Sequence, residues 1–134
     1  QLDHQLKNFK ERFTKPDTTK QVVFYDENNQ PDLKLNLEDI LYLESSNQYV
    51  LVYYGKSDDV KKHIIRNRLK HILLQTEDLP IEQCHRSFAV NLLKVNSMKK
   101  ISGKLFLIIE TSDSKVKIPV SKSFSEAIKK AFEA

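Results

Sequence analysis

A cysteine, a histidine and an arginine stand side by side in the stretch CHRSFAVNL, residues 84–92. A thiol beside an imidazole is the pair that a cysteine nucleophile needs. In a strand, however, Cys84 and His85 point to opposite faces, so their side chains cannot hydrogen-bond each other. The other three histidines of the chain stand in no recognisable catalytic motif. We therefore do not expect a catalytic cysteine here.

Metal and nucleotide sites find no better support. One cysteine and four histidines show neither Cys-x-x-Cys nor His-x3-His spacing, which structural zinc sites use. Gly55 and Gly103 are single turn glycines, whereas a phosphate-cradling loop needs several for close backbone approach. Carboxylate pairs such as Asp58-Asp59 fall in apparent turns, where solvation explains them. The sequence predicts no enzyme, no metal and no cofactor.

Arg86 is the member of this stretch whose chemistry is left to explain. The arginine side chain presents a rigid fork of donors that suits a phosphate or the O6/N7 edge of guanine. It equally suits a carboxylate elsewhere on the sheet. The residues alone leave both interpretations open.

Composition indicates a single domain. The chain has 134 residues, 40% of them hydrophobic, and its one cysteine cannot form an intramolecular disulfide. A single cysteine is compatible with a reducing compartment, so we expect a cytoplasmic protein. No apolar run approaches the roughly 20 residues of a membrane-spanning helix. Its net charge is uneven, because residues 1–80 carry 12 Lys+Arg against 13 Asp+Glu (−1) and residues 81–134 carry 10 against 5 (+5). The basic part fits a polyanion partner, and it also fits a solvated surface.

Residues 1–20 are predicted to form an amphipathic helix and a linker. Apolar residues recur at helical period over the first 13 residues, and Pro16 then breaks the pattern. Because the chain begins at Gln1, we expect it to be part of a longer or processed protein. The segment would join the domain to an upstream receiver or membrane region. The apolar stripe consists of Leu2, Leu6, Phe9 and Phe13.

Residues 21–134 are predicted to form one mostly β domain. Short apolar segments alternate with turn residues, and connections this short can join only antiparallel strands. Their regular spacing favours an antiparallel β-sandwich of small sheets. The expected core residues are Leu43, Val50, Val52, Phe88, Val90, Phe106, Ile108 and Val120. About nine strands are expected, within residues 21–32, 33–36, 39–45, 48–56, the start of 58–80, 81–92, 94–103, 104–113 and 114–121.

Two or three short helices complete the expected fold. Leu69, Ile72 and Leu73 share one helical face, and Pro80 ends that run. At the C-terminus Ser123 and Glu126 have the spacing of a capping box, which predicts a helix that starts there.

Four segments of the chain together resemble the LytTR DNA-binding domain of bacterial transcription regulators. They are LEDILYLESSNQYVLVYY, IIRNRLKHILLQ, CHRSFAVNLLKVNSM and VKIPVSKSFSEAIKKAF, in this order. The similarity runs from about Val22 to Phe132, and the HRSF-x-VN element is specific in this setting. The resemblance implies an elongated fold of small antiparallel sheets that binds duplex DNA by loops inserted into successive major grooves. It also implies a dimer on repeated promoter half-sites and a role as the output module of a response regulator in a two-component system.

The resemblance assigns roles to individual positions. Lys122 stands where many members carry arginine, which favours phosphate anchoring over base reading because lysine is a point charge. Cys84 and His85 are framework in this comparison, and Asn91 is expected to tie a loop backbone. The implied DNA contacts are Asn47, Gln48 and Tyr49 in one loop, Arg86 in a second, and Ser121 and Lys122 before the last helix. Further phosphate candidates are Lys94, Lys99, Lys100 and Lys115, which also read as plain surface lysines.

Two readings from other classes stay open. The same scaffold can dock a protein partner through the aromatic residues of its strands, without binding DNA. Alternatively, Cys84 can serve as a redox sensor if it is exposed and reactive.

Overall fold

The computed structural model of the protein describes residues 20–133 and shows ten strands and two α-helices in them. The predicted helix of Leu2, Leu6, Phe9 and Phe13 lies outside this range. The helices are α2 (Leu69–Gln75) and α3 (Lys122–Glu133), with short 3-10 turns η2 (Leu37–Asp39) and η3 (Leu92–Lys94). The strands are β1 (Gln21–Tyr25), β2 (Pro31–Asn36), β3 (Ile40–Ser46), β4 (Tyr49–Lys56), β5 (Asp59–Arg66), β6 (Ile81–His85), β7 (Phe88–Asn91), β8 (Ser97–Ile101), β9 (Lys104–Glu110) and β10 (Lys115–Val120).

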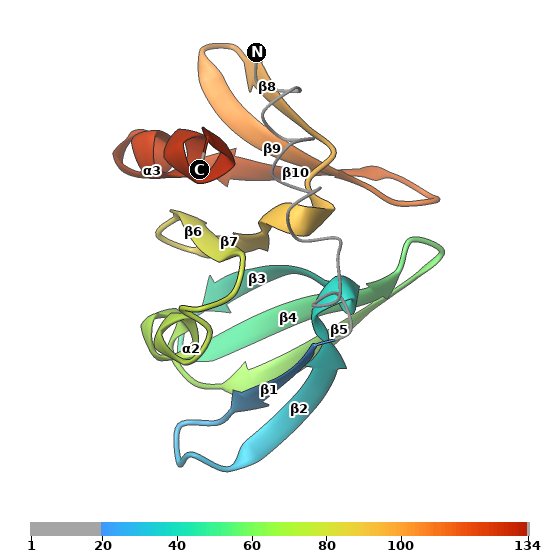
Figure 1. The fold of residues 1–134 in the computed structure, drawn as a ribbon, viewed down its shortest axis with the longest axis vertical. Coiled ribbons are helices and arrows are strands. Elements are labelled where there is room, and N and C mark those ends of the chain that lie inside the picture. The colour runs from blue at the N-terminus through green and yellow to red at the C-terminus, as the bar shows by residue number, and fades with distance from the viewer. Residues whose placement is uncertain (1–19, 134) are drawn as a thin grey trace.

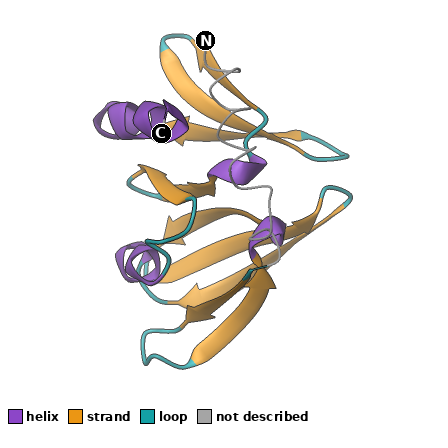
Figure 2. Ribbon diagram, viewed as in Figure 1, coloured by secondary structure: helices purple, strands orange, loops and turns teal. Residues whose placement is uncertain are grey.

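The strands form three antiparallel sheets that follow one another along the long axis (Figures 1 and 2). The central sheet has five strands in the order β5-β4-β3-β7-β6. The β1–β2 hairpin lies beyond one face of it, and the three-stranded sheet β10-β9-β8 lies beyond the other. The prediction of an elongated, mostly β arrangement of small antiparallel sheets is confirmed.

One predicted strand is wrong. Residues 81–92 form a hairpin, because β6 turns back into β7 at Arg86 and Ser87 and His85 pairs with Phe88. An irregularity in the pairing between Gln83 and His85 precedes the turn. Arg86 therefore lies in a tight turn between two strands, and the structure has ten strands where nine were expected.

The predicted start of the last helix is also wrong. Helix α3 begins at Lys122, so Ser123 lies inside its first turn and does not cap it. Ser121 precedes the helix instead, and its carbonyl accepts the backbone N–H of Phe124 in the first turn over 3.0 Å. The capping-box spacing identified the correct helix but placed its start too late.

The central sheet is buried on both faces, and this divides the interior into two cores. Adjacent residues of a strand point to opposite faces, so Leu43 joins one core while Tyr42 packs against the other. The first core lies against β1, β2 and α2 and includes Phe24, Val50, Val52, Ile65 and Ile72. The second lies against β8, β9, β10 and α3 and includes Val90, Leu107, Ile118, Ile128 and Phe132.

Most of the expected core residues are buried. Phe88 and Phe106 are the exceptions, being only partly buried. The buried ones are Leu43, Val50, Val52, Val90, Ile108 and Val120.

Asn91 ties the central sheet to the chain that enters it. Its side-chain N–H group donates to the carbonyl oxygens of Leu37 and Ile40, over 3.0 and 2.8 Å. Its side-chain oxygen accepts the backbone N–H of Leu93. Because Asn91 is fully buried, these bonds replace the water that its amide loses. The expected structural role of Asn91 is confirmed.

Candidate nucleic-acid interface

The three predicted DNA-contact segments lie at one edge of the molecule, on the left in Figure 1. The turn between β3 and β4 belongs to this edge, since Ser46 pairs with Tyr49 across it. The β6–β7 turn is tied alongside, because Ser45 donates its N–H to the carbonyl of Ser87 over 2.7 Å. The start of α3 is tied to the same hairpin by a 3.0 Å bond from the Ser121 N–H to the carbonyl of Cys84. We call residues 47–49, 66–68, 86–87 and 121–122 the loop edge.

In the β3–β4 turn, the three candidate contact residues differ in what holds them. Asn47 has a φ of 55°, a left-handed conformation that asparagine tolerates better than most residues. Tyr49 is the first residue of β4 and is 39% exposed. Gln48 and Tyr49 both accept hydrogen bonds from Arg66, over 2.8 and 3.3 Å. Asn47 thus has a conformational task, whereas Gln48 and Tyr49 are oriented by a third residue.

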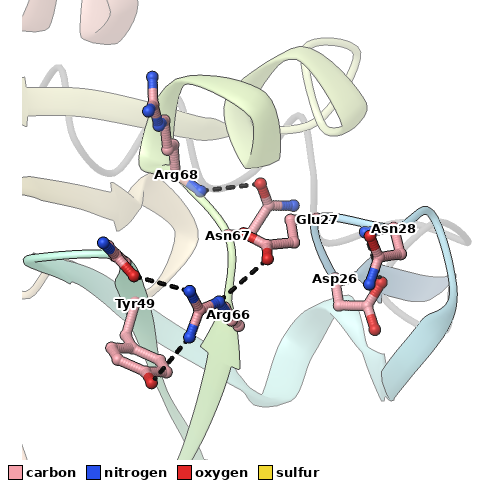
Figure 3. Close-up of polar contacts among 8 residues, drawn as sticks. Asp26, Glu27, Asn28, Tyr49, Arg66, Asn67 and Arg68 are labelled. Atoms are coloured by element: carbon pink, nitrogen blue, oxygen red, sulfur yellow. Dashed lines mark hydrogen bonds and ion pairs between the residues drawn. The ribbon is translucent and has the colours of Figure 1, made fainter.

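Arg66 is the centre of a polar network (Figure 3). It ends β5 opposite Tyr49, over whose ring its guanidinium lies at 5.7 Å from the centroid. Its Nε donates to Glu27 over 2.9 Å, and Glu27 returns a bond from its backbone N–H to the Arg66 carbonyl. The hydrogen bond that Arg66 donates to the Glu27 carboxylate raises the pKa of the Arg66 guanidinium above its usual value. One side chain thereby connects the β1–β2 loop to Gln48.

Asn67 supports the next turn of chain. It is almost fully buried, donates to the carbonyl of Tyr25 over 2.9 Å and accepts the backbone N–H of Arg68 over 2.8 Å. The Arg68 side chain is exposed and points away from the network in Figure 3. No carboxylate of the described residues forms an ion pair with Arg68. It adds an uncompensated positive charge to the loop edge.

The β6–β7 turn presents Arg86 to solvent. Within residues 20–133 no carboxylate pairs with it, so the carboxylate partner that the sequence left open is not observed. His85 fastens the turn, because its Nδ1 accepts the N–H of Ser87 over 3.1 Å. This hydrogen bond makes His85 a brace of the turn.

Cys84 lies beneath this turn, with its side chain fully buried. Burial raises the pKa of its thiol to about 12. Since the thiolate is the reactive form, a thiol in this state is inert at neutral pH. The position argues against the redox interpretation of Cys84.

The cationic side chains suggested for phosphate contact are not all in one place. Lys100 and Lys122 line the same pocket, together with His85 and Ser121. Lys99 is exposed on β8, the edge strand of the three-stranded sheet. Lys94 and Lys115 lie toward the opposite end: Lys94 lines a hollow with Ser57 of the β4–β5 turn, and Lys115 opens β10 after the β9–β10 turn. Ser57 and Ser112 join those two turns by a backbone bond of 2.8 Å.

Sequence reasoning missed Arg66, Arg68 and Glu27. Arg66 and Arg68 lie in the segment IIRNRLKHILLQ, where their alternation around Asn67 is a visible signal of a strand end rich in cations. Glu27 carries no such signal, because its contact with Arg66 spans 39 residues. Only the pairing of β4 with β5 and the position of the β1–β2 loop bring it to the edge.

The edge is suited to binding an anion. Arginine, lysine and amide side chains supply hydrogen-bond donors, and no buried nucleophile and base are paired beside them. In the described part of the chain, no group of three or more metal-ligating side chains lies close enough to hold a metal ion. None of the described helices has the length and apolar character needed to cross a membrane.

Comparisons with known proteins agree with this geometry. The model of the LytTr DNA-binding domain family matches residues 32–133. An uncharacterized response regulatory protein of Vibrio cholerae serotype O1 is 24% identical over 94 residues, which are 69% of this chain and 34% of that protein. The chain thus spans about a third of this relative. In fold, it is similar to the LytTr DNA-binding domain of a Bacillus cereus protein described as a methyl-accepting/DNA response regulator, with a TM-score of 0.58 at 19% identity over 85% of this chain and 97% of that one.

Proposed function

Because this chain belongs to the LytTr DNA-binding domain family, we propose that it binds duplex DNA through the loop edge, with side chains inserted into the major groove. The observation that carries the proposal is the convergence of three separate segments at one edge, tied by the Ser45–Ser87 and Ser121–Cys84 backbone bonds. Loops held on a rigid sheet can place side chains at groove spacing. Arg68, Arg86 and Lys122 give this edge positive charge that the DNA backbone would neutralise.

Gln48 is the base-reading residue of the first loop in this proposal. Arginine carries only donors, so Arg66 fixes which end of the Gln48 amide faces it: the oxygen accepts and the NH2 group points away. An amide presented in one orientation can make the bidentate contact with adenine N6 and N7. Asn47 instead sets the turn, and the hydroxyl of Tyr49 is engaged by Arg66. Of the two residues that Arg66 engages, only Gln48 has the amide arrangement of donor and acceptor that matches adenine.

Arg86 reads a base or grips a phosphate from the second loop. Its exposure in a two-residue turn and its lack of an ion pair in the described residues leave all five donors available. Ser121 and Lys122, in the third segment, bind phosphates of the DNA backbone. Lys100 and Lys99 are further phosphate contacts. Lys94 and Lys115 are left out of this interface, because they lie near the β4–β5 and β9–β10 turns, on the opposite edge of the molecule.

The wider role follows from the relatives. We infer that the chain is the output module of a bacterial response regulator, that it acts in the cytoplasm, and that two copies bind repeated half-sites in promoters. Residues 1–20 would then connect the module to a receiver or membrane region. The relative from Vibrio cholerae supports this inference, because it is a response regulatory protein of which the matched part is 34%.

An in vitro selection from random duplexes tests the proposal. We expect enrichment of a repeated half-site, and affinity for the selected duplex that falls steeply as salt rises, since each neutralised phosphate releases counterions. The proposal would be overturned if no sequence were enriched and the affinity for duplex DNA did not change with salt concentration.

The rival function is a protein-interaction module. Its aromatic docking surface has weaker support, because Tyr42 and Tyr53 stack on each other at 4.3 Å and pack against the second core. Burial raises the pKa of Tyr53, whose hydroxyl donates to Glu44. One feature does favour it: Val60 and Ile64 on the edge strand β5 are 42% and 54% exposed. Sequence-independent, salt-insensitive behaviour in the selection would support this rival.

A further inference from the structure

A pocket of about 500 Å³ opens beside the loop edge, between the β8–β9 turn and the first turns of α3. Its lining combines an apolar floor with a cationic rim, and no carboxylate is among the described residues that line it. The apolar lining residues include Phe106 and Pro119, and the floor consists of Leu105 and Val120, which share one face of the sheet. The rim carries His85, Lys100, Lys104, Lys122 and Lys129.

The sheet register explains why apolar and cationic groups meet here. Leu105 pairs with Lys100 on one side and with Val120 on the other, so these three side chains lie on one face of the three-stranded sheet. Ile128 and Phe132 of helix α3 are buried in the second core together with Leu105 and Val120, while the helix lies against β6. The first turns of the helix line the pocket instead.

The turn that forms the other wall is short and well defined. Ser102 and Gly103 have φ values of 53° and 79°, and Ile101 pairs directly with Lys104 across them. A two-residue turn with both residues in the left-handed region matches the twist of a hairpin. Lys100 and Lys104 are therefore held on either side of a compact turn and do not swing on a long loop.

The rim lysines lack negative partners. Elsewhere in the described chain Lys20, Lys56 and Lys61 form ion pairs, whereas none of the four rim lysines does. The first turn of α3 contains no acidic residue either, so the positive end of the helix dipole adds to the same field. Like charges gathered without a counter-charge are stabilised by a bound anion.

We propose that this pocket binds a small organic anion, a phosphate or carboxylate on an apolar body, and that the bound anion competes with DNA. A backbone phosphate of DNA needs only the rim, whereas the floor of Leu105 and Val120 fits an apolar group attached to the anion. The volume lies in the range of small-molecule sites, roughly 300–1,000 Å³. Competition rests on the proposed function, since Ser121 and Lys122 belong to both the pocket and the loop edge.

The test uses three probes that separate head from body: phenyl phosphate, inorganic phosphate and phenol. Binding is followed by amide chemical shifts in the NMR spectrum of the whole chain. We expect saturable shifts at residues 100–106 and 119–125 with phenyl phosphate, and at least tenfold weaker binding of the other two. Neutralising Lys104 and Lys129 together, as Lys104→Gln/Lys129→Gln, is expected to weaken phenyl phosphate about five- to tenfold, as for two partly exposed ion pairs. The matched control is Lys117→Gln/Lys130→Gln, the same charge change outside the pocket lining, with no expected effect.

DNA competition is measured separately, by the fluorescence anisotropy of a labelled duplex. We expect phenyl phosphate to raise the apparent Kd for DNA in proportion to its occupancy of the pocket. Equal affinity for inorganic and phenyl phosphate would overturn the proposal and leave a simple phosphate site, such as DNA would use. Equal behaviour of the two double variants would overturn the assignment to this pocket. If the chain bound no duplex at all, the proposed function would fail while the shifts with phenyl phosphate still reported on the pocket.

Discussion

The guanidinium of Arg66 donates to the side-chain oxygen of Gln48 over 2.8 Å while its Nε donates to Glu27 over 2.9 Å. Arg66 is therefore a positioning residue: the Glu27 carboxylate holds its guanidinium, and the guanidinium orients the Gln48 amide. Orientation matters because an amide reads a base only when its donor and acceptor ends are assigned. This chain of contacts makes base preference depend on residues that need not touch DNA.

Arg66→Lys keeps the charge and removes the fork. We expect affinity for random duplex to stay nearly the same, while the preference for the selected sequence falls about tenfold, the discrimination that one well-oriented amide provides. Competition between selected and random duplexes measures the change. Lys62→Arg, on the same strand and exposed, is the control and should change neither quantity. A variant with full sequence preference would remove Arg66 from its positioning role.

Glu27→Gln is expected to act in two opposite directions. Removing a negative charge near the loop edge raises affinity for any duplex, because the Glu27 carboxylate no longer repels the DNA phosphates. Releasing Arg66 lowers discrimination at the same time. A duplex-binding titration at several salt concentrations separates the two effects, with a steeper salt dependence expected for the variant. Asp32→Asn, which removes a charge from the same hairpin and keeps a side-chain oxygen beside His63, is the control for charge.

Arg86→Ala is expected to cost about 1–3 kcal/mol of binding free energy on the selected site and to relax the preference at one base. Lys99→Ala should instead weaken all sequences about equally, as a phosphate contact does. Lys94→Ala and Lys115→Ala, at the other end of the molecule, should leave binding unchanged. If Arg86→Ala bound the selected site as tightly as the parent, the role given to Arg86 would be wrong.

The sequence predicted the class of fold and much of the loop edge, and its errors have identifiable causes. The sequence predicts one strand where β6 and β7 form a hairpin, because Arg86-Ser87 carries neither the glycine nor the asparagine that marks most two-residue turns. Periodicity across such a turn remains close to that of a continuous strand. The resemblance nonetheless selected Arg86, since a motif records position without requiring the local turn to be recognised.

What the sequence could not provide was contact across distance. Whether Gln48 or Asn47 faces a partner depends on Arg66, and that contact exists only once β4 and β5 pair in register. Likewise, Lys100 and Lys122 line one pocket only because the folded chain places β8 beside the start of α3. Lys94 lies in η3 and lines a different hollow. The sequence identifies the basic residues, but which of them lie together depends on how the sheets pack.

Asn91→Ala is expected to lower the free energy of unfolding by about 2–4 kcal/mol, because it removes the three hydrogen bonds that the buried Asn91 amide makes with the backbone of Leu37, Ile40 and Leu93. Urea denaturation followed by circular dichroism measures the loss. Asn28→Ala, at an exposed loop position, is the matched control and should stay within about 0.5 kcal/mol of the parent. A loss that small for Asn91 would contradict its role as a buried clamp.

Cys84 is expected to resist alkylation in the folded protein, because its thiol is buried and burial raises its pKa to about 12. Iodoacetamide at neutral pH should modify it slowly in buffer and rapidly in denaturant. Ser123→Cys in a Cys84→Ala background places a thiol on the exposed start of α3 and gives the comparison rate. Rapid modification of native Cys84 would restore the redox interpretation.

The same burial gives stability a pH dependence of known sign. The folded state holds the thiol proton to about pH 12, while the unfolded chain releases it near its ordinary pKa of 9.0. The unfolded state therefore binds fewer protons between these values, and stability falls as pH rises through that window. Below pH 9 this contribution is fully present. Cys84→Ala should show a shallower alkaline loss of stability than the parent chain in urea titrations, and an identical slope would show that Cys84 stays protonated in both states or in neither.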